Sequence, residues 1–330
     1  MIDYIAAKFP CKHDTVGIKH FRQNYRSCRI KVGGTTIEVK SLEQGRFIAI
    51  SGNPVKSLQG HNIFGSNDLR GLCRDLFLLA MKELGINVKR SDQAAIDAGQ
   101  YSLSRVDLAL NFRLPSEEIV SKAIREIEWH WRENDLNVSN YGRETVYLNQ
   151  HSKVASTKIY DKRKEVLAHP LPENLLGKES CNRLRRYTGK LLRVEFVLRS
   201  TALRKLNMNI GAKWTTQKAK SLIQDNIKSL IIARDVQILH LPEEYKTWKP
   251  ELRQIYRLWL QGNDLDVLFE KKTLQRRRKA LLEIGIDIRI PPAADRVSTV
   301  SISSLLAVEN AKQVPRFAKR RGLFYKPTRP

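Results

Sequence analysis

Three segments of the sequence alternate apolar side chains with side chains that can act on a phosphodiester. Residues 105–112 place Asp107 among polar positions, residues 192–199 place Glu195 there, and a third segment adds Tyr160. Successive side chains of a strand point to opposite faces, so strands of one sheet would gather these groups on a single face. The side chains of this predicted polar face are Arg105, Asp107, Lys158, Tyr160, Arg193 and Glu195.

This set contains the parts needed to cleave a nucleic-acid backbone. Two carboxylates can hold a divalent metal, because hard cations prefer oxygen ligands. The metal and a basic side chain can neutralise the charge that builds on the phosphate oxygens. A tyrosine can attack as a phenolate if positive charge lies nearby, since its unperturbed pKa is about 10. The alternation leaves the choice of nucleophile open among Tyr141, Tyr147, Tyr160 and Tyr187.

A simpler explanation of the same pattern is a solvated sheet face. Antiparallel sheets commonly expose one polar face, on which acids and bases form neutralising ion pairs. If the face is catalytic, a tyrosine favours strand transfer over hydrolysis. A phosphotyrosyl link keeps the energy of the broken phosphodiester, so the strand can later be rejoined without ATP.

The net charge of the chain predicts a polyanionic partner. The 330 residues include 59 lysines and arginines against 34 acidic residues, a formal net charge of +25. Such an excess costs self-repulsion in the folded state, and DNA is the partner that we expect. No lipid-anchor motif or long apolar run indicates a membrane partner. Four cysteines without paired spacing predict neither a zinc cluster nor a disulfide framework, and favour a reducing cytoplasm.

The elements that must position these residues predict an α+β fold. Strand patterns occur at both ends of a Gly33-Gly34 turn and again in the three segments described above, whereas residues 68–84 and 115–131 have helical spacing. This order predicts a mostly antiparallel sheet with helices on one face. We assign residues 1–210 to this domain, to which the resemblance described below gives the catalytic role of a nuclease core.

The rest of the chain is predicted to be helical and basic. Residues 264–269 and 271–284 resemble a helix-turn-helix whose second helix carries Arg276, Arg277 and Arg278. We therefore expect a DNA-binding region at 211–292, followed by a basic, flexible tail at 293–330. A solvated basic helix face is the alternative explanation of the charge run.

Three motifs resemble the replication initiators of filamentous bacteriophages, the gene II/gene X family. The most specific is Pro54–Gly65, with its pattern Lys-x-Leu-Gln-Gly-His-Asn-x-Phe-Gly. The second is Ser102-x-Ser104-Arg105-Val106-Asp107. The third is Leu192-Arg193-Val194-Glu195 with the preceding Ile159-Tyr160-Asp161-Lys162-x-x-Glu165. The order and spacing agree over roughly residues 1–210, and more loosely to about 290.

The resemblance implies a rolling-circle replication initiator. Such an enzyme nicks one strand of supercoiled phage DNA at the origin through a tyrosine, forms a 5′-phosphotyrosyl link and leaves a 3′-OH primer. It later rejoins the displaced strand. By the same resemblance a host helicase and a DNA polymerase are partners, and the host bacterial cytoplasm is the location.

The resemblance also assigns roles to individual residues. Tyr160 occupies the place of the nucleophile, with Lys158, Lys162 and Glu165 around it. Asp107 and Glu195 occupy the places of acids that hold a divalent metal, Mg²⁺ or Mn²⁺. Many rolling-circle initiators hold their metal with a His-hydrophobic-His pair, which this sequence lacks. Metal binding must therefore depend on carboxylates, with His61 as a further candidate.

The resemblance further predicts a loop that faces DNA. A turn after a strand can offer backbone N–H groups to phosphate, and the expected contacts in this loop are Lys56, Gln59, His61 and Asn62. The alternative is a tight connection in which Asn62 or Asn67 caps the next helix. On the sheet, Arg105 and Arg193 complete the predicted DNA contacts.

Two other classes of protein compete with the nickase. A non-catalytic origin-binding protein or repressor would also be basic, and in such a protein Tyr160 would be dispensable. A tyrosine recombinase would use an Arg, His-x-x-Arg and Tyr set, but the sequence contains no His-x-x-Arg.

Overall fold

The computed structural model describes residues 1–19, 25–142, 144–230, 236–239, 241–292 and 297–327. The chain forms two compact units. The sheet unit comprises Met1–Ala233 and Leu306–Pro330, and the helical unit comprises Arg234–Leu305. Among the described residues, no helix is both long enough and apolar enough to cross a bilayer.

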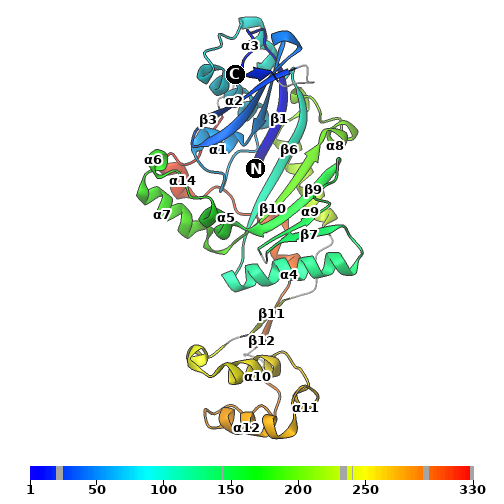
Figure 1. Cartoon of the computed structure of the whole chain (residues 1–330), viewed down its shortest axis with the longest axis vertical. Coiled ribbons are helices and arrows are strands. Elements are labelled where there is room, and N and C mark those ends of the chain that lie inside the picture. Colours follow the sequence, from blue (N-terminus) through cyan, green and yellow to red (C-terminus); the bar gives the residue numbers. More distant parts are fainter. Residues whose placement is uncertain (20–24, 143, 231–235, 240, 293–296, 328–330) are drawn as a thin grey trace. The chain divides into compact units, whose positions relative to one another are not determined.

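A ten-stranded antiparallel sheet forms the centre of the sheet unit (Figure 1). Its strand order is β2-β3-β4-β5-β1-β6-β10-β9-β8-β7. Strands β6 and β10 are therefore central, and β9 lies next to them. The strands are β1 (Ile2–Pro10), β2 (Ile18–Lys19), β3 (Tyr25–Val32), β4 (Thr35–Leu42), β5 (Phe47–Gly52), β6 (Ser102–Arg113), β7 (Val138–Tyr141), β8 (Thr145–Leu148), β9 (Ala155–Asp161) and β10 (Leu191–Arg199).

The hairpin between β3 and β4 turns at the two glycines that the sequence indicated. Gly33 and Gly34 have φ values of +53° and +77°, which a two-residue hairpin turn of this kind requires and which glycine adopts without strain. A Cβ atom on Gly33 would lie 1.8 Å from the carbonyl oxygen of Ser57. The hairpin therefore packs closely against the helix that follows β5.

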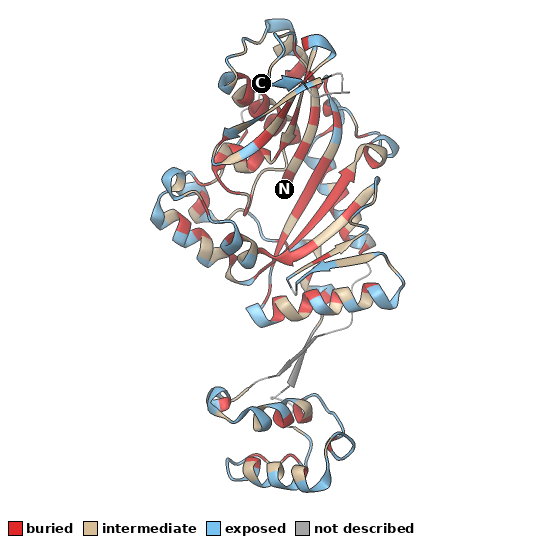
Figure 2. Cartoon of the chain, viewed as in Figure 1, coloured by how far each residue is buried: buried red, intermediate tan, exposed pale blue. Residues whose placement is uncertain are grey.

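Helices surround the sheet, and the apolar sides of its strands face them. Val106, Leu108, Leu192 and Val194 are completely buried. Figure 2 shows long buried stretches along the strands of the sheet. The helices of this unit are α1 (Pro54–Gln59), α2 (Leu69–Glu83), α3 (Arg90–Asp97), α4 (Glu117–Glu133), α5 (Lys162–Ala168), α6 (Glu173–Leu176), α7 (Lys178–Tyr187), α8 (Ser200–Lys205), α9 (Thr216–Ser229) and α14 (Arg316–Arg320), with short 3₁₀ turns at η1 (Glu43–Gly45), η2 (Thr188–Lys190), η3 (Gly211–Lys213) and η6 (Val308–Asn310).

The predicted antiparallel sheet with packed helices and a helical C-terminal region is confirmed. Helix α4 packs on β8, β9 and β10, and the Phe77 ring of α2 lies 5.0 Å from that of Phe9 in β1. The polar side of the sheet has a cover that the sequence did not indicate. Asn62, in the segment after α1, contacts the side chains of Arg193 and Lys162.

The helical unit has a small core of its own. Ile255, Tyr256, Leu274 and Leu281 are buried in one apolar cluster. The predicted pair of helices is present as α11 (Leu265–Leu268) and α12 (Lys271–Leu282), and Asp264 caps α11 by accepting hydrogen bonds from two backbone N–H groups. The other elements are β11 (Val236–Leu239), η4 (Glu243–Thr247), α10 (Pro250–Leu260), β12 (Val297–Val300) and α13 (Ile302–Leu305).

The structure divides the chain differently from the predicted domains. Helix α9 belongs to the sheet unit, where Ala219 and Ile223 are buried, although it was assigned to the DNA-binding region. The described end of the chain, residues 306–327, also packs on the sheet unit instead of forming a free tail. Ala318 and Leu323 join an apolar cluster with Phe64. The segment has few apolar residues among many basic ones, so its sequence pattern did not predict this packing.

We predict that the C-terminal segment stabilises the sheet unit. Leu323 is 4% exposed, so Leu323→Ala should lower the free energy of unfolding by about 2–5 kcal/mol, because it removes buried methyl groups and leaves a cavity. Leu206→Ala is the matched control, since Leu206 is 43% exposed, and its cost should stay near 0.5 kcal/mol. Urea unfolding measures both values. Equal stability of the two variants would contradict the packing of this segment.

Candidate active site

The register of the central strands brings the predicted polar side chains together. Arg193 in β10 lies opposite Tyr160 in β9, and Glu195 lies opposite Lys158. On the other side of β10, Glu195 pairs with Ala109 of β6. Paired residues of antiparallel strands point to the same face. Asp107 is two residues from Ala109 and therefore lies on that face too.

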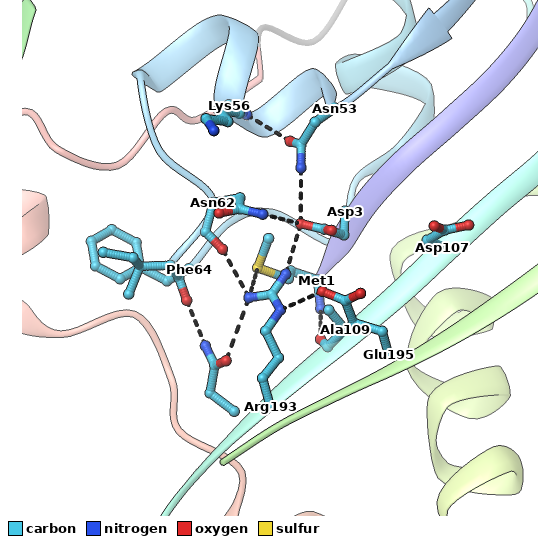
Figure 3. Close-up of polar contacts among 12 residues, drawn as sticks. Met1, Asp3, Asn53, Lys56, Asn62, Phe64, Asp107, Ala109, Arg193 and Glu195 are labelled. Atoms are coloured by element: carbon cyan, nitrogen blue, oxygen red, sulfur yellow. Dashed lines mark hydrogen bonds and ion pairs between the residues drawn. The ribbon is translucent and has the colours of Figure 1, made fainter. Parts of the chain in front are cut away.

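The centre of this face is the guanidinium of Arg193, which is completely buried. It donates hydrogen bonds to Asp3 Oδ1 at 2.7 Å and to Glu195 Oε1 at 2.8 Å. A third hydrogen bond, of 2.8 Å, goes to the backbone carbonyl oxygen of Asn62 (Figure 3). One cation thus holds two carboxylates and the loop after α1 in fixed positions.

Asp3 is a member of the site that the sequence analysis missed. Ile2 pairs with Leu108 and Tyr4 with Asp107, so Asp3 is the extra residue of a β-bulge. A bulge re-aims a side chain, and Asp3 reaches the polar face. The available signal was the adjacent polar pair Asp3-Tyr4, which interrupts the alternation between two isoleucines.

Two amides hold Asp3 in its ionised form. Asn53 and Asn62 donate hydrogen bonds to Asp3 Oδ1 at 3.0 and 3.1 Å (Figure 3). Burial acts to raise the pKa of Asp3, but Arg193, Lys162 and the two amides outweigh it, so the pKa lies below its usual value of 3.8. Asn53 is also the N-cap of α1, accepting a hydrogen bond from the Lys56 backbone N–H. The cap therefore connects α1 to the buried charges.

Tyr160 lies beside the carboxylate of Glu195. Its hydroxyl donates a hydrogen bond of 2.8 Å to Glu195 Oε1. The side chain is 3% exposed, and burial together with the charge of Glu195 raises the tyrosine pKa well above its usual value of 10. The Lys158 ammonium lies 4.3 Å from the ring centroid. Tyr160 is thus a neutral phenol paired with a carboxylate, not a preformed phenolate.

Lys162 and Glu165 interact with each other instead of with the tyrosine hydroxyl. The completely buried Lys162 ammonium donates to Glu165 Oε2 at 2.7 Å and to Asn62 Oδ1 at 2.9 Å. Burial lowers the pKa of Lys162, and the positive charge of Arg193 lowers it further. Among the described residues, no hydrogen bond joins Glu165 to Tyr160. Lys162 contacts the loop that covers the site through Asn62, and Glu165 binds Lys162.

Asp107 is a buried carboxyl group of the face with a raised pKa. Burial raises its pKa from 3.8 to about 6, and the negative charges of Glu195 and Asp3 act in the same direction. Arg105 opposes this effect through two hydrogen bonds to Asp107, of 2.8 and 2.6 Å. The excess of negative charge around Asp107 is what a bound cation would relieve.

The fit of a metal to this face is partial. Within the described parts of the chain, no three or more histidines, cysteines or acids gather into a metal centre. Asp107 and Glu195 nevertheless lie on adjacent strands and the same face, and they supply oxygen ligands of the kind that Mg²⁺ prefers. Such an ion commonly keeps several waters, so two carboxylates are sufficient protein ligands.

His61 and Gln59 lie inside the protein. His61 Nε2 is 2.9 Å from the carbonyl oxygen of Leu323, and burial lowers the histidine pKa to about 4. The Gln59 amide donates to the carbonyl oxygens of His61 and Phe64 and accepts from the backbone N–H of Tyr325. In this structure both side chains bind the C-terminal segment and are turned away from solvent.

The remaining loop residues have different surroundings. Asn62 belongs to the buried network, and Lys56 is half-buried on α1. Neither Asn62 nor Asn67 caps the next helix, because the side chain of Asp68 accepts the hydrogen bond from the Gly71 N–H at the start of α2. The short acidic side chain directly before the helix takes the capping place.

The three predicted arginines of the helical unit lie on α12. Arg276 is exposed, and Arg278 forms an ion pair of 2.9 Å with Asp266 on α11. The Arg277 guanidinium lies 4.9 Å from the centroid of the Phe269 ring, and its buried Nε and one terminal nitrogen have no hydrogen-bond partner among the described residues. Positive charge is therefore available on this helix.

Comparison with known proteins assigns the family. The model of the N-terminal part of the phage replication-associated protein, the gene II protein, matches residues 1–217. The model of the C-terminal part of the same protein matches residues 249–324. The chain belongs to the gene II replication-associated protein family. This confirms the resemblance to filamentous-phage replication initiators and identifies a phage replication protein.

Relatives in the gene II family include three phage proteins of graded similarity. The chain is 28% identical to the replication-associated protein of Enterobacteria phage I2-2 over 337 aligned residues, which cover 94% of each chain. It is 32% identical to the replication-associated proteins of Enterobacteria phages fd and M13 over 93 residues, which are 28% of this chain and 20% of theirs.

A solved rolling circle replication initiator protein from Geobacillus stearothermophilus is a distant structural neighbour. It covers 76% of this chain and 91% of its own at 11% identity, with a TM-score of 0.29. Similarity at this level supports no argument about fold or function.

We predict that loss of Arg193 destabilises this gene II family fold strongly. Arg193→Met leaves Asp3 and Glu195 buried without their cation, and should cost about 3–5 kcal/mol of unfolding free energy. The control Arg132→Met breaks an exposed ion pair with Glu128 on α4 and should cost about 0–1 kcal/mol. Urea unfolding compares the two. If Arg193→Met is as stable as the control, the buried network is not a stabilising feature.

We also predict a pH dependence that is specific to Asp107. Between about pH 4 and pH 6 the folded state holds this carboxyl protonated while the unfolded chain ionises it, so the unfolding free energy falls as the pH rises through this window. Relative to Asp107→Asn, the wild-type protein in EDTA should lose about 2 kcal/mol between pH 4 and pH 7. Unfolding curves at both pH values measure this difference. If the difference in unfolding free energy between the two proteins does not change with pH, Asp107 is exposed to water and not buried.

Proposed function

We propose that this replication protein initiates rolling-circle synthesis by nicking one strand of its phage origin, with Tyr160 as the nucleophile and Glu195 as the general base. The hydrogen bond of 2.8 Å from the tyrosine hydroxyl to Glu195 Oε1 is the observation that carries the proposal. A nucleophile and its base within hydrogen-bond distance, with the base oriented by a third group, are what covalent catalysis requires. Here Arg193 is the orienting group.

The reaction is a transesterification at one phosphodiester. The Tyr160 oxygen forms a bond to phosphorus, and its proton passes to Glu195. The bond from phosphorus to the 3′ oxygen breaks, and that oxygen takes up a proton from water to become the 3′-OH primer, while the protonated Glu195 returns its proton to the resulting hydroxide. The 5′ phosphate remains on the tyrosine. In the reverse reaction a 3′-OH attacks this link, and the proton returns to the tyrosine.

The perturbed pKa of Tyr160 determines when the proton moves. Since burial and Glu195 disfavour the phenolate, proton transfer accompanies attack instead of preceding it. Lys158 and Arg105 lie on the same face and are partly exposed, so they can neutralise the phosphate oxygens as charge develops. Lys158 lies next to the tyrosine ring and is the nearer of the two.

A divalent cation, Mg²⁺ or Mn²⁺, fits the same face. Asp107 and Glu195 would hold it, and when bound it would supply charge neutralisation at the scissile phosphate. The raised pKa of Asp107 supports this assignment, because burial and, to a smaller extent, two neighbouring acids increase the cost of ionising it. These carboxylates also hold basic side chains in place without the metal. Asp107 pairs with Arg105, and Glu195 pairs with Arg193.

The wider assembly follows from charge and from the family. The basic face of α12, with Arg276, Arg277 and Arg278, would contact phosphates of origin DNA. The substrate would be supercoiled double-stranded DNA, and the displaced product would be single-stranded. A host helicase and a DNA polymerase would extend from the 3′-OH in the host bacterial cytoplasm.

A second candidate function is origin binding without cleavage. The burial of Tyr160 favours it, because a hydroxyl on a side chain that is 3% exposed must be uncovered before a phosphate can reach it. In that function the carboxylates, Arg193 and Tyr160 form a structural network only, and the basic residues carry all of the activity.

We predict that Tyr160→Phe abolishes nicking and covalent linkage, with a loss of roughly a thousand-fold or more. The matched control is Tyr4→Phe, because Tyr4 lies on the same sheet face, opposite Asp107, and is more exposed. Supercoiled DNA carrying the cognate origin is incubated with each protein and Mg²⁺. Denaturing gels then report the nick and the protein-linked 5′ end.

The outcomes distinguish the two functions. Activity in the control but not in Tyr160→Phe supports the nucleophile. Loss in Tyr4→Phe alone assigns the reaction to the more exposed tyrosine. If the wild-type protein binds the origin and never cuts it, the chain is a binding protein.

A further inference from the structure

A basic pocket lies at the end of the central strands, outside the buried charge network. Its volume is about 400 Å³, within the usual range for ligand sites. It is lined by cations from β6, α5, α7 and η2, with a single acid from α4: Arg113, Arg163, Arg185, Arg186, Lys190 and Glu117.

Much of the positive charge of this pocket is not neutralised. Arg163 pairs with Glu117, and Arg185 pairs with Glu173. Among the described residues, Arg113, Arg186 and Lys190 have no carboxylate partner. Arg113 donates to the carbonyl oxygen of Tyr187, and Lys190 to that of Pro115, which fixes their positions without removing their charge. An anionic ligand would find preplaced donors here.

The pocket also has an apolar side. Val166 and Leu167 of α5 line it, and the Leu167 side chain is 58% exposed. Cations beside exposed apolar surface suit the phosphate and the sugar or base of an unpaired nucleotide, whereas a duplex presents its bases stacked inside.

The position of the pocket relates it to the tyrosine. Lys190 precedes β10, whose first residue, Leu191, pairs with Arg113. Arg193, which pairs with Tyr160, is three residues after Lys190, a span of about 10 Å. Helix α5 begins directly after β9, so the strand that carries Tyr160 leads into the wall of the pocket.

We propose that this pocket binds single-stranded DNA, holding the backbone phosphate and the unpaired nucleotide next to the scissile position. Arg186, Lys190 and Arg113 contact the phosphate, and Leu167 contacts the sugar or base. The proposal rests on the proposed nicking function for its biological role, but single-strand binding can be measured without cleavage. It deepens that function by naming a strand-holding subsite separate from the reacting groups.

The test compares two double variants of the full chain with equal charge. Arg186→Ala/Lys190→Ala removes two exposed pocket cations, and Lys89→Ala/Arg90→Ala removes one lysine and one arginine that are exposed at α3. Binding of an oligothymidylate of about 16 nucleotides and of a hairpin duplex is measured by fluorescence anisotropy over a range of salt concentrations. Equal urea midpoints establish that both variants are folded.

The pocket variant should lose single-strand affinity selectively. Each lost phosphate contact lowers the salt slope by about 0.7, so two contacts remove about 1.4, or about 25-fold in Kd at 0.1 M salt relative to 1 M salt. The control and duplex binding should change little. An equal loss in both variants, or an equal loss for the duplex, overturns the proposal, because net charge alone would then explain it.

The measurements distinguish an error in the pocket proposal from an error in the proposed nicking function. A Tyr160→Phe protein should retain the full single-strand salt slope. If the wild-type protein never nicks but the pocket variant still loses single-strand binding, the pocket remains and the catalytic assignment is wrong. If nicking depends on Tyr160 but the pocket variant binds like the control, only the pocket is overturned.

Discussion

The buried guanidinium of Arg193 is the constraint on which the rest of the sheet unit depends. A fully buried charge is tolerated only when partners satisfy it, and this one has two carboxylates and a backbone carbonyl. Those partners come from β1, β10 and the loop after α1. The need to surround one cation therefore fixes the bulge in β1, the cap of α1 and the position of the loop. It also fixes the carboxylate that receives the tyrosine hydroxyl.

Glu195 and Asp107 lie on the same face of the sheet but have different partners. Glu195 Oε1 accepts from both Arg193 and Tyr160, so one carboxylate oxygen connects the buried cation to the tyrosine hydroxyl. Asp107 lies outside this arrangement and is paired with the partly exposed Arg105. Burial and the negative charges of Glu195 and Asp3 raise its pKa to about 6. The two carboxylates therefore have different partners on one face.

The C-terminal segment binds two side chains of the Pro54–Gly65 motif. The family resemblance predicts that Gln59 and His61 face DNA, yet they bind the backbone of Leu323 and Tyr325. A buried polar side chain must be hydrogen-bonded, and a returning segment with free backbone groups meets that requirement. Gln59 and His61 thus occur in the motif at least in part because they bind a segment more than 250 residues away along the chain.

The sequence alone determined the strands that carry the predicted polar face, the side of the sheet on which its side chains lie, and the glycine hairpin. It also determined the basic charge that predicts a polyanionic partner. These follow from periodicity, local backbone preference and composition, which are properties of neighbouring residues. Only the tertiary structure decided that Asp3 joins Arg193, 190 residues away, that His61 is a core residue, and that the end of the chain packs on the sheet unit. The physical reason is that alternation fixes which way a side chain points but not what it meets. That depends on register and on contacts between segments distant in sequence, which local patterns do not encode.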